Sequence, residues 1–161
     1  TASGDYPLES VKTMSLIIVR TEEYYSQVSR LQESLLHEQS KTVTSATTAA
    51  AAQAINSLDA SAAVAFTHSG ATALAISRLR PQLPIFALTP FAHICRRLSI
   101  VWGIIPSITK IMKHTDEMPR LSKVALEKVG LWKPKSHIVI LSGTPVARPG
   151  STNLLKIHEI K

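Results

Sequence analysis

Short apolar segments alternate with helical segments along the second half of this chain, and that alternation limits the fold most strongly. Strands of this kind, which are buried on both faces, pair in sheets covered by helices, so the sequence predicts an α/β sandwich. The expected strands lie at 62–67, 84–88 and 137–141, with a shorter one within 103–111 that is interrupted near Pro106. The expected helices lie at 70–79, 89–100 and 115–130.

Other segments fit the same plan. Residues 154–160 alternate apolar and polar side chains, which is typical of an edge strand. Before the first strand we expect a helix from Pro7 to about Tyr25 and an alanine-rich helix over 42–58, capped by one of its first Thr or Ser residues. Within the sandwich, Thr89 and Pro90 are expected as the cap and first residue of their helix.

The loop after the first predicted strand has the composition of a phosphate-binding loop. Thr67, Ser69 and Thr72 offer hydroxyl donors, and Gly70 lets the backbone approach a ligand closely. A second loop, residues 142–153, follows the strand at 137–141 and contributes the guanidinium of Arg148. Ligands of open α/β sheets bind beyond the carboxyl ends of parallel strands, which favours these loops as a site. The alternative is that both are ordinary connecting loops, in which Ser, Thr, Gly and Asn are common.

Composition narrows the classes of function. The chain has 161 residues, 45% hydrophobic and 18% charged, which suits one globular domain. Its net charge of +7 favours anionic ligands, but the bases are too dispersed to indicate nucleic-acid binding. No apolar run is long enough for a membrane span. The lone Cys95, expected to be buried, indicates a reducing cytoplasm without disulfides, and the scattered histidines and carboxylates predict neither a metal site nor a catalytic centre.

Several motifs occur in order along the chain. Residues 1–11, TASGDYPLESV, are similar to the pattern E-T-A-x-G-x-Y-P-x-E-x-V without its leading glutamate. Residues 66–73, FTHSGATA, contain a T-x-S-G-x-[ST]-A loop. Four further segments are RLRP at 78–81, PIFALT at 84–89, TDEM at 115–118 and GSTNLLKIH at 150–158. Together, and in this order, the motifs resemble the C-terminal domain of pyruvate kinase, of the bacterial kind.

The resemblance implies a three-layer α/β/α sandwich with a five-stranded mixed sheet of order 3-2-1-4-5, its last strand antiparallel. It implies that residues 1–25 are the end of the catalytic barrel with a connecting helix, and that 26–161 form the C-terminal domain. The family's catalytic residues, which use magnesium and potassium to make pyruvate and ATP from phosphoenolpyruvate and ADP in glycolysis, would lie upstream, so this chain is expected to hold no catalytic residue and no cofactor.

The resemblance also implies an allosteric site for a sugar phosphate or nucleotide, such as fructose 1,6-bisphosphate, AMP or ribose 5-phosphate, and a homotetramer. One departure concerns Ala71, where many members have Arg or Lys. A structural domain with an empty effector crevice and a free-standing domain with its own activity are the alternatives. The expected effector-binding residues are Thr67, His68, Ser69, Gly70, Ala71, Thr72, Arg148 and Gly150.

Overall fold

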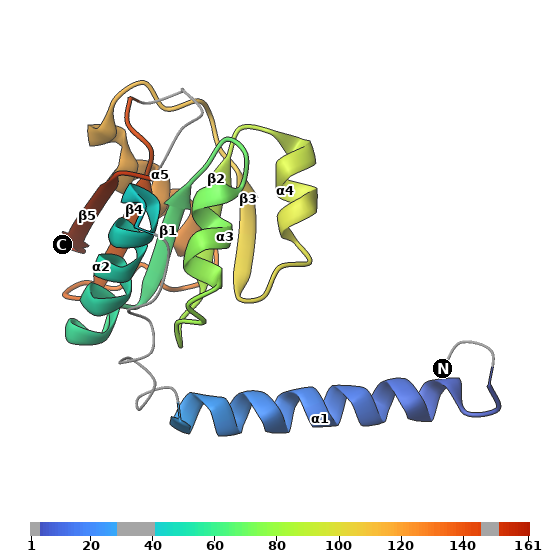
Figure 1. Ribbon diagram of the computed structural model, residues 1–161. Coiled ribbons are helices and arrows are strands. Elements are labelled where there is room, and N and C mark those ends of the chain that lie inside the picture. The colour runs from blue at the N-terminus through green and yellow to red at the C-terminus, as the bar shows by residue number, and fades with distance from the viewer. Residues whose placement is uncertain (1–3, 29–40, 146–151) are drawn as a thin grey trace. The chain divides into compact units, whose positions relative to one another are not determined.

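The computed structural model describes residues 4–28, 41–145 and 152–161 (Figure 1). Its contacts divide the chain into two units, Thr1–Gln39 and Ser40–Lys161. In the first unit, helix α1 (Pro7–Val28) begins at the expected proline and extends three residues past Tyr25. Its apolar side chains are largely exposed, including Leu8 at 70%, Leu16 at 66% and Ile17 at 59%.

The second unit is an α/β sandwich built on a five-stranded sheet of order β3-β2-β1-β4-β5, which confirms the predicted fold class. Strands β1 to β4 are parallel, and β5 pairs antiparallel with β4 at the edge. The strands are β1 (Ala62–Phe66), β2 (Ile85–Thr89), β3 (Ile104–Ile108), β4 (His137–Ser142) and β5 (Leu154–Glu159).

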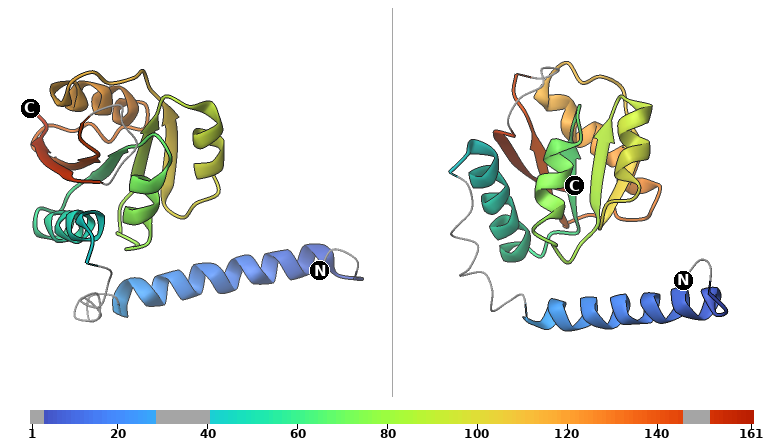
Figure 2. Two further views of the ribbon diagram at one scale, coloured as in Figure 1. Left: turned by 45° about the horizontal axis from the view of Figure 1, so that its top comes forward. Right: turned by 45° about the vertical axis from the view of Figure 1, so that its right-hand side comes forward.

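Helices cover both faces of this sheet, as the views in Figure 2 show. One face packs against α2 (Val43–Ser57), α3 (Ala71–Ser77) and α4 (Ala92–Leu98), and the other packs against α5 (Met118–Glu127). Successive residues of a strand point to opposite faces. Ala63 and Ala65 of β1 therefore face the three-helix layer, where their small side chains admit close packing, and Val64 faces α5.

Thr42 caps α2, in agreement with the sequence. Its Oγ1 accepts the backbone N–H of Ser45 at 3.1 Å, and Ser45 Oγ accepts the N–H of Thr42 at 3.2 Å. This reciprocal pair satisfies two backbone N–H groups at the start of the helix. The alanine-rich segment is therefore an ordered helix, with Thr48, Ala51 and Ile55 buried.

Three local expectations were wrong. Thr89 is not a helix cap but the fully buried last residue of β2, where it pairs with Ile108, and α4 begins only after Phe91. Strand β3 runs through Pro106 without a break, since an edge strand tolerates the missing N–H. Cys95 is half-buried because α4 buries Ile94 and Leu98, one turn apart, and Cys95 lies beside that face.

Candidate functional site

The two loops predicted to form a site do meet at the carboxyl edge of the sheet. The strand order reverses between β1 and β4, which makes their ends the switch point of the sheet. There, the hydroxyls of Thr72 and Thr152 are hydrogen-bonded at 2.8 Å, and both side chains are buried. This bond joins the start of α3 to the segment that leads into β5.

The first loop is fixed by its own hydroxyl groups. Thr67 is buried, and its Oγ1 accepts the backbone N–H of Gly70 at 2.8 Å. Gly70 has a φ of +90°, which glycine adopts without strain. Ser69 and Ala71 are exposed, and Ser69 Oγ accepts the N–H of Ala71 at a long 3.4 Å. Only this last bond is weak enough to be replaced at little cost by a stronger acceptor.

The second loop is described at its two ends. Thr144 N–H and Oγ1–H donate to Asn153 Oδ1 at 2.7 and 3.0 Å, and Asn153 Nδ2 donates to the Thr144 carbonyl at 2.7 Å. The backbone N–H of Thr152 donates to Thr44 Oγ1 of α2 at 3.1 Å. Arg148 and Gly150, both expected at the site, lie outside the described residues.

Helix α4 contributes a cation that sequence reasoning missed. The Nη2 of Arg97 donates to the backbone carbonyl of Ser69 at 2.6 Å. Strand β2 lies beside β1, so the helix that follows β2 comes next to the loop that follows β1. Arg96 and Arg97 are visible in the sequence as a basic pair, but only the strand order shows which loop they approach.

His68 belongs to an aromatic cluster at the same edge. Its ring meets the ring of Phe91 edge-on at 5.7 Å between centroids, and the ring of His93 lies 5.8 Å from that of Phe91. Phe91 is 38% exposed. Within the described ranges, no three His, Cys, Asp or Glu side chains are grouped as metal ligands.

Two titratable groups outside these loops have shifted pKa values. The backbone N–H groups of Lys113 and His114 donate to the carboxylate of Glu117 at 2.9 and 3.1 Å and lower its pKa. Burial, followed by the charges of Lys156 and Lys161, lowers the pKa of His158, whose ring lies 5.8 Å from that of Trp132. Neither group is in the loops at the switch point.

A cavity of about 400 Å³ lies at the opposite, amino-terminal edge of β2 and β3. Its lining is mostly apolar, and Arg80 stacks on the nearby Trp102 ring at 5.2 Å. It is thus separate from the predicted phosphate loop. The lining residues are Pro81, Gln82, Leu83, Pro84, Trp102, Gly103, Ile104 and Ile105.

These features define the class of the protein: an α/β domain whose mostly parallel sheet carries paired hydroxyl-rich loops at its switch point. The family model described as "Pyruvate kinase, alpha/beta domain" matches residues 45–158. The chain therefore belongs to the pyruvate kinase family and corresponds to the C-terminal domain of the bacterial enzymes, as its motifs had indicated.

Individual relatives agree. A pyruvate kinase of Geobacillus stearothermophilus is 38% identical over 160 residues, which are 99% of this chain and 27% of that protein. One from Agrobacterium vitis is 38% identical over 161 residues, which are 99% of this chain and 33% of that protein. The chain thus spans about a third or less of these relatives. The crystal structure of a Cryptosporidium parvum pyruvate kinase has the same fold, with a TM-score of 0.72 over 83% of this chain and 26% of its own, at 20% identity.

None of the helices among the described residues has the length and apolar character needed to cross a membrane.

Proposed function

We propose that this chain is the regulatory domain of a pyruvate kinase and binds a phosphorylated allosteric effector between the loops at 67–72 and 143–153. The observation that carries the proposal is the preformed loop at 67–72. Within it Thr67 accepts the N–H of Gly70, and at its end Thr72 is hydrogen-bonded to Thr152 across the switch point. Sugar phosphates and nucleotides are the ligand classes expected from the family resemblance. Switch points of open α/β sheets are favoured positions for such ligands.

The groups available to a phosphate lie on the exposed side of the first loop. Ser69 presents its hydroxyl, and the N–H of Ala71 is held by only a long hydrogen bond. Arg97 adds positive charge from α4. The hydroxyls of Thr67 and Thr72 are buried and already paired, so their role is to shape the loop rather than to contact the ligand first.

A structural domain with an unused effector site is the second candidate, and Ala71 favours it. A methyl group stands where many family members carry a cation, which removes one charge from the site. In that case the domain serves assembly alone. The two candidates differ in one measurable property, which is whether any phosphorylated effector binds.

The remaining proposals concern the whole enzyme. We propose that the parent protein transfers a phosphoryl group from phosphoenolpyruvate to ADP in glycolysis, in the cytoplasm. Magnesium and potassium would bind to parts of the parent protein that this chain does not include. We also propose that residues 1–25 form the end of its catalytic barrel with a connecting helix, that the barrel of the parent protein covers the exposed apolar side chains of α1, and that the protein is a homotetramer.

Calorimetric titration of the chain with fructose 1,6-bisphosphate, AMP, ribose 5-phosphate and glucose 6-phosphate tests the effector proposal. We expect one of them to bind at submillimolar concentration, and Ser69→Glu to abolish that binding by charge repulsion without unfolding the domain. Gln82→Glu is the matched control, because it adds the same charge in the loop before β2, at the other edge of the sheet. If none of the four binds at millimolar concentration, the regulatory function is wrong and the structural one stands.

A further inference from the structure

The contact between α4 and the first loop is unusually short and carries a full charge. Arg97 Nη2 lies 2.6 Å from the carbonyl oxygen of Ser69, and this hydrogen bond joins residues 28 positions apart in the sequence. Hydrogen bonds from an ionised donor are shorter and about twice as strong as neutral ones. The contact therefore joins the guanidinium of α4 to the backbone of the loop at Ser69.

The same guanidinium lies directly over Gly70. A Cβ placed on Gly70 would come within 3.3 Å of Arg97 Nη2 and within 3.3 Å of Leu98 Cδ2. The arginine therefore occupies the space that a side chain at position 70 would fill. This places its charge over Gly70, the residue before Ala71, whose N–H makes a long 3.4 Å hydrogen bond to Ser69 Oγ.

A guanidinium has five N–H donors in a planar fork, and the Ser69 carbonyl uses one of them. Arg97 is exposed on its outer side, so the other donors are accessible to a ligand. Among the residues that the structure describes, it is the one cationic side chain that hydrogen-bonds this loop. His68, which belongs to the loop itself, packs edge-on against Phe91.

We propose that Arg97 is the phosphate-binding cation of this site, one that reaches the loop from α4 and replaces the charge missing at Ala71. It has two roles, both of which rest on the same side chain. It holds the Ser69 peptide in the binding conformation, and it donates its remaining N–H groups to the phosphate. The second role rests on the proposed effector function, whereas the first is a property of the ligand-free chain.

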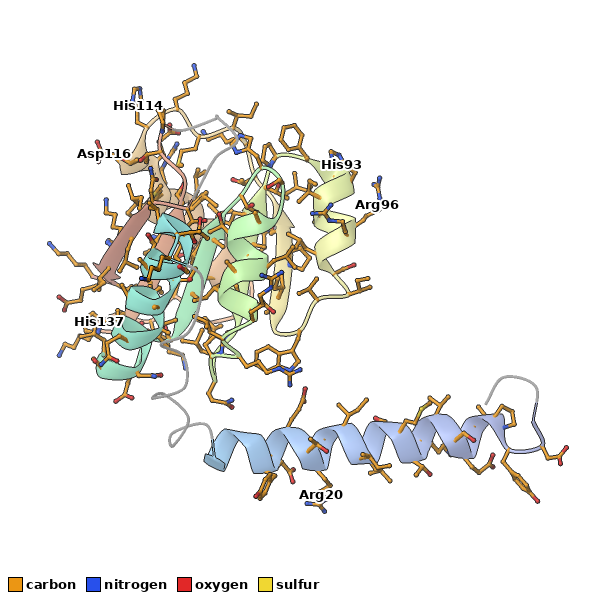
Figure 3. The ribbon with its side chains drawn as sticks, in the orientation of Figure 1. Arg20, His93, Arg96, His114, Asp116 and His137 are labelled. Carbon is orange, nitrogen blue, oxygen red and sulfur yellow. The ribbon has the colours of Figure 1, made fainter. Side chains whose placement is uncertain are left out.

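Arg96 provides a matched control. It is the adjacent exposed residue of α4, and Figure 3 shows its side chain on the outer side of that helix, pointing away from the sheet. Arg96→Gln and Arg97→Gln remove the same charge from neighbouring positions, but only the second removes the hydrogen bond to Ser69. Arg97→Lys keeps the charge and loses the planar fork.

Amide hydrogen exchange of the ligand-free chain tests the first role. We expect Arg97→Gln to speed exchange at Gly70 and Ala71, with Arg96→Gln equal to wild type. Equal exchange in all three proteins would overturn this role. Circular dichroism spectra of each variant separate this local effect from loss of folding, because both arginines are exposed and neither belongs to the core.

Calorimetric titration with fructose 1,6-bisphosphate and AMP tests the second role. We expect Arg97→Gln to weaken binding about tenfold or more, since hydrogen bonds between charged groups are stronger than neutral ones. Arg96→Gln should change the affinity by less than about threefold. The loss of affinity in Arg97→Lys should lie between the losses in the two glutamine variants. Equal losses for both glutamine variants would overturn the contact and leave only a general electrostatic effect. If wild type binds neither of these probes nor ribose 5-phosphate nor glucose 6-phosphate, the contact to phosphate fails together with the effector function.

Discussion

The hydroxyls of Thr72 and Thr152, eighty residues apart, form a buried 2.8 Å hydrogen bond that ties the segment after β1 to the segment before β5. Both side chains are buried, so each hydroxyl has the other as its partner and little access to water. Removing one partner leaves the other without its bond, which is more costly than removing both.

Thr72→Val should therefore lower the free energy of unfolding by about 1–3 kcal/mol, since valine keeps the shape and loses the hydroxyl. The double variant Thr72→Val with Thr152→Val should lose less than the sum of the two single losses. Urea unfolding of the four proteins measures this double-mutant cycle. Strict additivity would mean that the two hydroxyls are not coupled.

Gly70→Ala tests the close approach of α4 to the loop. A residue with a side chain in the left-handed region costs about 1–2 kcal/mol, and here the new methyl group also meets Arg97 and the fully buried Leu98 at 3.3 Å. Gly130→Ala is the control, because Gly130 has a φ of +71° with no atom near its Cβ position. Thermal unfolding should show the larger loss at position 70, and equal losses would contradict the crowding.

Glu117→Gln should change how stability depends on pH. The backbone N–H groups of Lys113 and His114 favour the ionised carboxylate, so the pKa of Glu117 is lowered from its ordinary 4.5. A lowered pKa in the folded state adds stability above the ordinary value, and this stability is lost as pH falls through the folded pKa. In urea unfolding from about pH 6 to pH 3, the wild-type advantage over Glu117→Gln should shrink toward acid. An advantage that stays constant would be inconsistent with the lowered pKa.

Lys156→Gln should raise the pKa of His158. Burial lowers this pKa most, and the charge of Lys156 is the next cause, so removing that charge returns part of the shift. Proton NMR titration of the imidazole measures the change. Lys110→Gln serves as control, since Lys110 acts on Glu117 rather than on His158. The assignment fails if both lysine variants leave His158 unchanged.

The sequence predicted the sheet well because its inner strands are mostly apolar, its last strand alternates apolar and polar residues, and its helices are periodic. Thr42 at the start of α2 was also predictable, since capping depends on residues only three positions apart. Thr89 was misassigned because a hydroxyl before proline favours a helix cap locally, whereas in the fold the carbonyl of Thr89 accepts the N–H of Thr109, the residue that follows β3, at 3.0 Å. A tertiary contact overrode a local preference.

The local part of the candidate site was predictable, and the part contributed by a distant segment was not. Thr67 and Gly70 lie within one short segment, and their hydrogen bond follows from local loop chemistry. Arg97 was missed because its partner, Ser69, belongs to another strand-to-helix connection. Contacts of that kind depend on which strands are neighbours, and this is known only once the sheet order is known.

The hydrogen bond from Gly70 to Thr67 also bears on the thermodynamics of ligand binding. The loop is already in one conformation before any phosphate arrives, so binding does not have to order the backbone. An effector at this site should therefore associate with a small change in heat capacity and without the large entropic penalty of a folding loop. If an effector regulates the protein through this loop, the donors of the loop exchange their acceptors at an existing surface, and no transition from disorder to order is required.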